Sequence, residues 1–314
     1  MDEPAPLYCY RHPDRPTRIT CRRCGRPICG ECMIPAAVGF QCPECVKQGA
    51  RQTRQNRGSY GGERSSNPRQ TSLILIIANF VVFAVITVAG WIVPRWGIVQ
   101  YLGLRPEGIC VPLDAANTYY PGVGQAACLG GGGHWIPGVA DGAWWQVVTS
   151  MFTHVSIIHI GMNCLTLWFI GPPLEMYLGR VRFLVTDFLS GLVGSLAVYW
   201  LSGNQTLSYG ASGALFGVMG ALFIVLWQQR GDFKQLLLWI GLNLVVTFLP
   251  FGGGAGSISW QAHLGGLVGG LAIASVWAFL PRGDNRVRNQ WILIALIAVI
   301  VVVGLAARSL VLAN

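Results

Sequence analysis

A serine stands at the start of one long apolar stretch of this sequence. The segment YGASGALFG, residues 209–217, holds Ser212 between small residues, and a later stretch, WQAHLGGLVGG, carries His263 near its start. A serine hydroxyl is a weak nucleophile until a neighbouring base takes its proton. Because polar side chains inside apolar spans are costly and are functional candidates by default, Ser212 and His263 are the first candidates for a site.

A further polar group lies in the segment HVSIIHIGMN. Its candidate side chains are His154, His159 and Asn163. Glycines accompany the other two candidates: Gly266 and Gly270 follow His263 at the third and seventh positions, and Gly213 follows Ser212. Small faces let two helices approach closely. A serine and an imidazole on touching helices can then hydrogen-bond, and the alternative is that the two side chains only hold helices together.

The N-terminal region contains four pairs of metal-ligand residues, each with a two-residue spacer. The pairs are Cys9 and His12, Cys21 and Cys24, Cys29 and Cys32, and Cys42 and Cys45. Eight such ligands suffice for two tetrahedral zinc sites with no position left open for water. The alternative, a disulfide knot or scattered free thiols, is disfavoured in a reducing cytoplasm. We therefore expect two structural zinc ions, which supply much of the folding energy of a region too short for a sufficient core.

Composition separates this polar head from a larger membrane body. The chain has 314 residues, of which 53% are hydrophobic and 11% charged, whereas soluble domains carry about 25% charged residues. The N-terminus has no basic segment followed by an apolar run, so it is not a signal peptide and the head stays in the cytoplasm. Residues 47–70 are rich in Gly, Ser, Gln and Arg and predict a flexible basic linker. Its arginines either touch anionic lipid headgroups or are simply solvated.

The body contains apolar runs long enough to cross a bilayer. They predict seven helices, at about 72–93, 151–171, 182–201, 210–227, 235–251, 260–280 and 290–312. The loops after the second, fourth and sixth spans carry seven Lys and Arg residues, whereas the short loops after the third and fifth carry none. By the positive-inside rule, the N-terminus lies inside, and the C-terminus and the long loop 94–150 lie outside.

This orientation brings the polar side chains into one layer. Spans two, four and six all start outside, so Ser212, His263, His159 and Asn163 lie in the outer half of the membrane. The long loop also holds Cys110 and Cys128, on the oxidising side, where either a disulfide or two thiols fit.

Three motifs in these spans together resemble the rhomboid intramembrane serine proteases. They are GASG in the fourth span, AHLGGLVGG in the sixth and HVSIIHIGMN in the second. All occur in the order and on the spans that the family has, and the resemblance covers about residues 72–312. It implies an all-α polytopic membrane protein, a rhomboid-like bundle of seven transmembrane helices with a six-helix core and one C-terminal helix. A small N-terminal zinc-binding domain, residues 1–46, precedes the linker at 47–70 and the membrane domain at 71–314.

The resemblance also implies roles for the matching residues. Ser212 is then the nucleophile and His263 the general base of a dyad without a carboxylate. His159, Asn163 and the Ser212 backbone N–H are implied to stabilise the oxyanion. Supporting positions are Gly210, which leaves room for substrate, Phe216, placed against the imidazole, His154, a structural histidine, and the packing glycines Gly213, Gly266 and Gly270.

The head resembles the cross-braced zinc modules of the B-box type. That likeness implies Cys9, His12, Cys29 and Cys32 on one zinc ion and Cys21, Cys24, Cys42 and Cys45 on the other. Two sequential sites are the alternative from the sequence. Such modules mostly bind proteins, so a cytoplasmic protein partner fits the head, and no nucleic acid partner is expected.

Two positions depart from the family pattern. Trp145-Gln146 stands where the family has Trp-Arg, at a position that organises the outer loop, and Asp187 lies within the third span. We interpret Asp187 as structural, either neutral or paired with an arginine such as Arg182.

The expected function is an intramembrane serine endopeptidase of the plasma membrane that acts on transmembrane proteins without a catalytic cofactor. The alternative is a catalytically silent rhomboid-like adapter that binds transmembrane proteins, although such relatives typically lack the serine or the histidine. A transporter would need polar residues through the whole depth of the membrane.

Overall fold

The computed structural model describes residues 7–52, 58–92, 97–113, 118–248 and 259–313. The chain divides into two compact units, Met1–Asn56 and Arg57–Asn314. Each unit has its own core, one built around cysteines and the other around apolar helices.

The first unit is small and built around its cysteines. Two short hairpins pair β1 (Leu7–Tyr8) with β2 (Pro16–Thr17) and β3 (Ile34–Pro35) with β4 (Phe40–Gln41). A single 3₁₀ turn, η1 (Gly30–Cys32), and one helix, α1 (Pro43–Gln52), complete it. Among the described residues of this unit, Ile28 is the one fully buried apolar side chain apart from the cysteines. So little apolar burial cannot stabilise a fold by itself.

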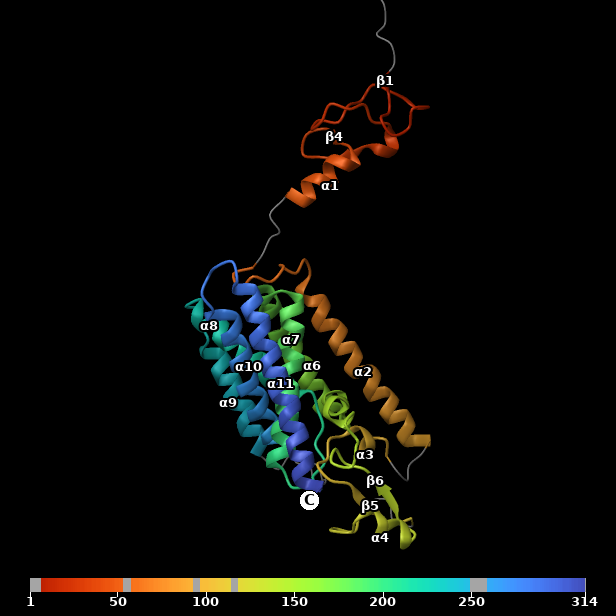
Figure 1. Cartoon of the computed structure of the whole chain (residues 1–314), viewed down its shortest axis with the longest axis vertical. Helices are drawn as coiled ribbons and strands as arrows, with labels where there is room; N and C mark the ends of the chain where they lie inside the picture. The colour runs from red at the N-terminus through yellow and green to blue at the C-terminus, as the bar shows by residue number, and fades with distance from the viewer. Residues whose placement is uncertain (1–6, 53–57, 93–96, 114–117, 249–258, 314) are drawn as a thin grey trace, which may run out of the picture. The chain divides into compact units, whose positions relative to one another are not determined.

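The second unit is a bundle of apolar helices (Figure 1). The long helices are α2 (Pro68–Ile92), α6 (Ile157–Leu178), α7 (Arg180–Leu201), α8 (Ser212–Gln228), α9 (Lys234–Phe248), α10 (Trp260–Phe279) and α11 (Arg286–Ala313). Within the described residues, 5 of them are long and apolar enough to cross a membrane, and α8 and α9 are shorter apolar helices. The prediction of a helical, polytopic membrane protein is confirmed at this level.

Glycines set the spacing of α8 and α10 at the centre of this bundle. A Cβ atom on Gly266 would lie 1.9 Å from the Gly213 carbonyl oxygen, and one on Gly270 would lie 1.9 Å from that of Gly217. The two contacts are four residues apart on both helices, so α8 and α10 run in parallel with their backbones in contact. This places the first turn of α8 beside the first turn of α10.

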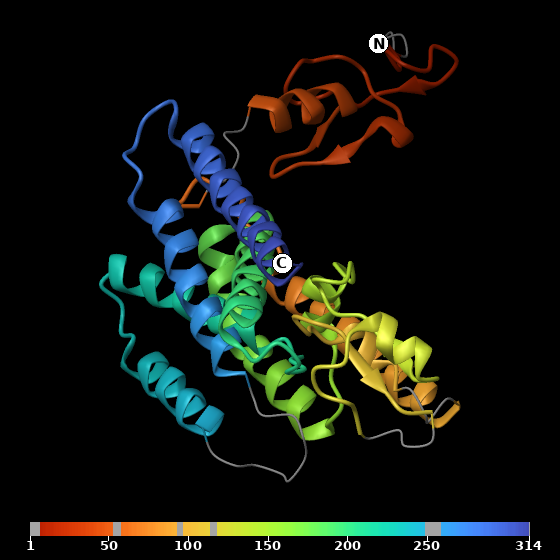
Figure 2. The ribbon, with the colours of Figure 1, turned by 60° about the horizontal axis from the view of Figure 1, so that its bottom comes forward.

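The segment between α2 and α6 forms a separate cap at one end of the bundle. It contains α3 (Val99–Leu102), β5 (Ile109–Val111), α4 (Gln125–Gly130), β6 (His134–Ile136), α5 (Gln146–Thr149) and η3 (Ser150–Phe152). Strands β5 and β6 pair in antiparallel register, and Cys110 forms a disulfide with Cys128. Figures 1 and 2 both show these elements gathered near the C-terminal end of α2.

The second predicted span differs from the observed helix at both ends. Residues 151–156 do not start the helix, because Thr153 and Ser156 have extended backbone conformations and α6 begins at Ile157. Its C-terminal end lies at Leu178, beyond the predicted 171, because the helix continues through Pro172 and Pro173. Prolines are tolerated in membrane helices where neighbouring groups compensate for the missing hydrogen bonds. For the fifth span, the predicted end at residue 251 lies outside the described residues.

The predicted linker, residues 47–70, also differs from the structure in two places. Its first part continues helix α1 to Gln52. Its later part, Gly58–Glu63, which we call the tether, belongs to the second unit: Tyr60 is 1% exposed within the apolar core of the bundle. The composition of the linker is polar, but one aromatic side chain suffices to dock it.

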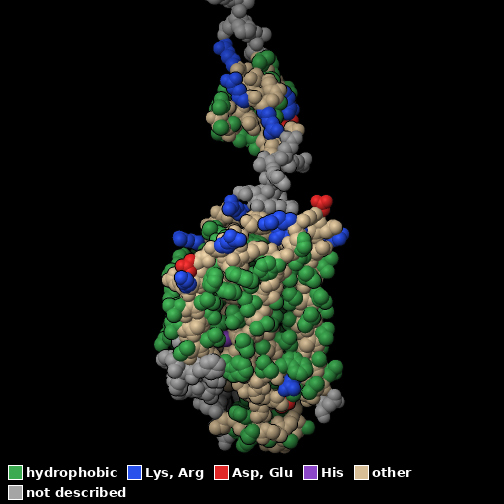
Figure 3. Space-filling view, turned by 90° about the vertical axis from the view of Figure 1, so that its left-hand side faces the viewer, with side chains coloured by type: hydrophobic (Ala, Val, Ile, Leu, Met, Phe, Trp, Pro, Cys, Tyr) green, Lys and Arg blue, Asp and Glu red, His purple; other side chains and the backbone are tan. Residues whose placement is uncertain are grey.

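Polar contacts fix this tether at the end of the bundle that carries Lys and Arg, which Figure 3 shows above the hydrophobic sides. Buried Arg182 of α7 donates to the Tyr60 carbonyl oxygen and to Gln290 of α11. Gln229, just after α8, donates to the Tyr60 hydroxyl at 3.0 Å. The tether therefore joins three helices that are distant in sequence.

Candidate active site and metal sites

Ser212 and His263 meet across the α8–α10 contact. The His263 Nε2 atom lies 2.7 Å from the Ser212 Oγ atom, in hydrogen-bond range. Ser212 is the first residue of α8, and His263 lies in the first turn of α10. His263 is buried at 4% exposure, and Ser212 is half-buried. The parallel glycine contacts described above bring these two first turns together, so residues 51 positions apart form one pair.

Two further side chains hold the imidazole of His263. The Phe216 ring stacks on it, with ring centroids 4.3 Å apart and planes inclined by 20°. Thr247, near the C-terminal end of α9, places its Oγ1 atom 2.7 Å from His263 Nδ1. Thr247 was missed in the sequence because it stands in an apolar helix outside every motif. A hydroxyl in an apolar span was the one available signal, and it is weak because such hydroxyls usually bond within their own helix.

Three further polar side chains lie next to this pair, those of His154, His159 and Asn163. His154 and Asn163 are joined by a hydrogen bond, and His159 packs against the His154 ring. The His154 Nδ1–H donates to the Phe152 carbonyl oxygen, and its Nε2 accepts from Asn163 Nδ2 at 2.9 Å. The backbone N–H of Ala211 also points to His154 Nε2, at 3.4 Å. His154 is fully buried, so it links α6 to the residue before Ser212. His159 packs edge-on against His154 at 5.1 Å between centroids.

A small cavity opens at Ser212. Its volume is about 40 Å³, and its lining includes His159, Tyr209, Gly210 and Ser212. A buried water needs about 10–15 Å³ of such volume, so the cavity has room for about three or four waters. Gly210 has a φ of +125°, and a Cβ atom there would lie 2.7 Å from the His159 ring. Only glycine fits this position, and its conformation turns the chain into the start of α8.

Gln146, the departure noted in the sequence, connects the outer segments around the site. It is fully buried, accepts from the Arg105 backbone N–H at 3.1 Å and donates to the Pro137 carbonyl oxygen at 2.9 Å. The Arg105 guanidinium in turn donates to Gln100 and to the Gln205 carbonyl oxygen. Burial lowers the pKa of Arg105 to about 10, so its side chain still carries a charge at neutral pH. An amide at position 146 thus organises the loop without a charge of its own.

Comparison with known proteins agrees with this geometry. The Rhomboid domain matches residues 141–282, which include every residue of the Ser212 site described above. The chain is 31% identical over 142 residues to Putative rhomboid protease YdcA of Bacillus subtilis (strain 168), across 44% of this chain and 69% of YdcA. The chain belongs to the rhomboid family.

Other rhomboid relatives match over smaller parts of their length. Rhomboid protease GluP of Bacillus subtilis (strain 168) is 35% identical over 176 residues, which is 54% of this chain and 34% of GluP. Rhomboid-like protease 3 of Toxoplasma gondii is 31% identical over 164 residues, 50% of this chain and 60% of the relative. The chain thus spans only about a third of the length of GluP.

The eight predicted metal ligands of this rhomboid form two groups in the first unit. In each group the ligand atoms all lie within 4.8 Å of one another. One group is Cys9, His12, Cys29 and Cys32, and the other is Cys21, Cys24, Cys42 and Cys45. This division is the one that cross-bracing implies. The alternative of two sequential sites is not the arrangement found in the structure.

The spacing of the ligand atoms suits zinc. Tetrahedral Zn–S bonds of about 2.3 Å set two sulfur atoms about 3.8 Å apart, and the Sγ atoms of Cys24 and Cys42 lie 3.8 Å apart. The His12 Nδ1 atom lies 3.3 Å from the Cys29 Sγ atom and 3.5 Å from that of Cys32. The donor sets, three thiols with one imidazole and four thiols, are those of structural zinc sites.

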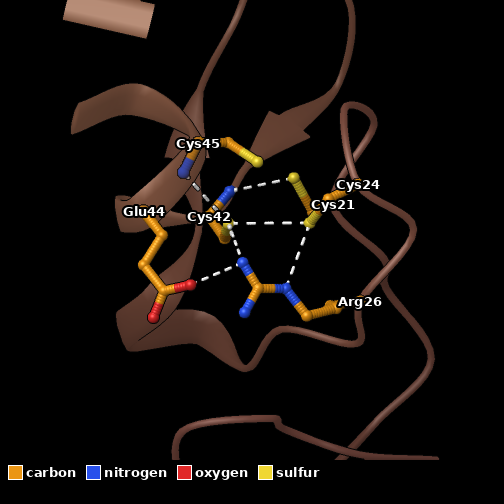
Figure 4. Close-up of polar contacts among 6 residues, drawn as sticks. All are labelled: Cys21, Cys24, Arg26, Cys42, Glu44 and Cys45. Atoms are coloured by element: carbon orange, nitrogen blue, oxygen red, sulfur yellow. Dashed lines mark hydrogen bonds and ion pairs between the residues drawn. The ribbon is translucent and has the colours of Figure 1, made fainter. Parts of the chain in front are cut away.

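Arg26 lies beside the four-cysteine group, as Figure 4 shows. Its Nε–H donates to the Cys24 Sγ atom at 3.3 Å, and its Nη2 atom lies 3.8 Å from the Cys42 Sγ atom. Glu44 forms an ion pair with the same guanidinium at 2.5 Å. Cys24 is exposed, whereas its three partners are buried, so Arg26 covers the open corner of this group.

Proposed function

We propose that this rhomboid is an intramembrane serine protease that hydrolyses peptide bonds in or near the transmembrane segments of membrane proteins. The observation that carries the proposal is the 2.7 Å contact between Ser212 Oγ and His263 Nε2. The contact borders a cavity with room for water. The rhomboid protease names of several relatives support the same reaction class.

In the proposed mechanism, His263 acts as the general base. Its Nε2 atom takes the proton of Ser212 as Oγ attacks the peptide carbonyl carbon, and the imidazolium then gives that proton to the leaving amine. A water from the cavity attacks the resulting acyl ester with the same histidine as base. The products are two peptides, and the serine and histidine return to their starting protonation.

The oxyanion of the tetrahedral intermediate needs donors near Ser212. The Ser212 backbone N–H is one candidate, because the first N–H groups of a helix have no intrahelical acceptor. His159, which lines the cavity, is a second. Asn163 donates to His154 in this state, so its proposed contribution uses the other amide proton or a rearranged side chain.

Cleavage of a single-span reporter in liposomes tests this proposal. We expect the wild type to cut in or beside the span, and Ser212→Ala and His263→Ala to lose cleavage and fluorophosphonate labelling. Ser275→Ala is the matched control, because Ser275 lies in α10 and its hydroxyl donates to the Leu271 carbonyl oxygen of the same helix. Folded wild type that neither cuts nor is labelled would favour the silent adapter.

For the first unit, we propose two structural zinc ions, one in each ligand group, and a role in binding a cytoplasmic protein. Eight protein ligands leave no open coordination position for catalysis. The zinc ions would supply folding energy that the small apolar core lacks. The ligand spacing and the two donor sets support this assignment.

For the whole chain, we propose seven membrane spans in the plasma membrane, with the N-terminus in the cytoplasm and the C-terminus outside. The five long apolar helices and the shorter α8 and α9 supply the spans. The Lys and Arg residues gathered at one end of the bundle support the orientation. The proposed domains are a zinc module in the first unit and a protease domain in the second, joined by a linker shorter than the predicted 47–70 because the tether packs into the second unit.

A further inference from the structure

Thr247 contacts the imidazole of His263 on the side opposite Ser212. Its Oγ1 atom lies 2.7 Å from His263 Nδ1, and His263 Nε2 lies 2.7 Å from Ser212 Oγ. The same Thr247 hydroxyl also donates to the Asn243 carbonyl oxygen, one turn earlier in α9, at 2.8 Å. Thr247 is buried at 7% exposure. A continuous chain of hydrogen bonds therefore runs from α9 through His263 to Ser212.

The proton count along this chain determines the form of the imidazole. A threonine hydroxyl has one proton and two lone pairs. When that proton goes to the Asn243 carbonyl oxygen, the oxygen can only accept from His263, so Nδ1 carries the imidazole proton. The Nε2 atom then has a free lone pair directed at the Ser212 hydroxyl. The opposite tautomer would place a proton on Nε2, where it could not take one from serine.

We propose that Thr247 is a positioning residue that holds His263 in the Nδ1–H tautomer and so completes a Ser–His–Thr triad. The inference rests on the proposed protease function. The reaction needs no carboxylate in this arrangement, because a neutral hydroxyl, tied to the α9 backbone, orients the base. When the imidazole becomes protonated in the reaction, its Nδ1–H still has an acceptor, so the charged form keeps the same orientation.

Two variants of Thr247 test the role of the hydroxyl. Thr247→Val keeps the shape and removes the hydroxyl, and we expect kcat to fall about tenfold with little change in KM. Thr247→Ser restores the hydroxyl and should recover most of the lost rate. The rate of fluorophosphonate labelling of Ser212 should fall and recover in parallel, because labelling needs the base but no protein substrate.

Thr87→Val is the matched control. Thr87 in α2 makes the same one-turn hydrogen bond, to the Phe83 carbonyl oxygen at 2.8 Å, and lies outside the catalytic machinery. We expect wild-type kcat and labelling for this variant. A fall in activity in both valine variants would indicate a general effect of losing such a bond and would contradict the proposal.

Nitrogen-15 NMR of histidine-labelled protein reads the tautomer directly. The His263 signals, assigned by their loss in His263→Ala, should report a protonated Nδ1 in the wild type and a mixture of tautomers in Thr247→Val. A protonated Nε2 in the wild type, or Thr247→Val with an unchanged kcat, would overturn the inference. Wild type that is folded but neither cleaves nor is labelled would instead contradict the proposed function itself.

Discussion

Arg26 distinguishes the two ligand groups that we propose to bind zinc. It donates to sulfur atoms of the four-cysteine group, those of Cys24 and Cys42. A zinc ion with four thiolates carries a net charge of −2, whereas three thiolates and a neutral imidazole leave −1. Arg26 lies at the exposed cysteine of the group with the greater excess of negative charge, whereas Arg15 lies beside the buried Cys29 of the other group.

We therefore predict that Arg26→Gln makes one of two bound zinc ions easier to remove. Release of the first zinc ion to a chelator should be about two- to fivefold faster, and release of the second should be unchanged. Arg22→Gln is the control. It removes the same charge from the same unit, because Arg22 is exposed and follows Cys21 in the sequence. Stoichiometric zinc analysis and a colorimetric chelator provide the measurement.

Two outcomes of this experiment separate its assumptions. Protein that contains no zinc after purification with the metal present would contradict the two-zinc proposal. If Arg26→Gln and Arg22→Gln both contain two zinc ions and release them at equal rates, only the role proposed for Arg26 is contradicted.

At this scale the sequence predicts residues that belong to motifs and misses residues that act through tertiary contact. Ser212 and His263 were found from type, spacing and apolar surroundings, and the structure brings them within hydrogen-bond distance. Thr247 and Arg26 were not found, because the one is an isolated hydroxyl in an apolar helix and the other is one of many arginines. Their partners are set by how α9 and the cysteine hairpins pack, which local sequence does not encode.

Among the helices, the α8–α10 contact determines the position of the site. The backbones touch at Gly213 with Gly266 and at Gly217 with Gly270. A side chain at Gly266 or Gly270 would meet the α8 backbone at 1.9 Å and so separate the first turns that carry Ser212 and His263. The glycines are therefore as necessary for the geometry as the two polar residues.

We predict that Gly270→Ala lowers both stability and activity. Its Cβ atom would lie 1.9 Å from the Gly217 carbonyl oxygen, and such overpacking costs about 1–3 kcal/mol. Gly90→Ala in α2 is the matched control, since a Cβ atom there meets nothing within 4 Å. Thermal unfolding in detergent and the Ser212 labelling rate measure the two effects. An unfolding temperature for Gly270→Ala equal to that of Gly90→Ala would show that the helices can move apart freely.

Helix ends were harder to predict than helix identity. Hydropathy located α6, but its true start depends on Thr153, whose hydroxyl bonds to the Thr149 carbonyl oxygen and caps the preceding turn. Its true end depends on tolerance of Pro172 and Pro173 inside a packed bundle. Both effects come from tertiary or side-chain contacts, so an apolar count over the sequence placed both ends of α6 too early along the chain.

On the scale of the whole molecule, the tether is the part of the predicted linker that belongs to the membrane unit. Tyr60 lies in the core with α7, α8 and α11 around it. Gly62 also fits closely, since a Cβ atom there would lie 1.9 Å from the Leu178 carbonyl oxygen. The polar composition of residues 47–70 predicted none of this, because a single docked aromatic residue hardly changes an average.

We predict that Tyr60→Ala destabilises the membrane unit by about 3–5 kcal/mol, the usual cost of removing a buried aromatic side chain. Tyr60→Phe removes only the bond from Gln229 and should cost about 1 kcal/mol. Tyr119→Ala, which truncates a tyrosine that is 46% exposed, should leave the unfolding temperature unchanged. Equal unfolding temperatures for Tyr60→Ala and Tyr119→Ala would mean that the tether does not stabilise the bundle.

The docked tether also decides where this chain can be shortened. A form that starts at Pro68, where the first long helix begins, would lose the Tyr60 carbonyl oxygen that accepts from Arg182. It would leave a guanidinium that is 3% exposed without that acceptor, and burying a charge with fewer partners is costly. A form that starts at Gly58 keeps the acceptor and the tyrosine. The cutting point for separating the cysteine-rich unit from the membrane unit therefore lies before Gly58, 14 residues before the start of the first apolar run at residue 72.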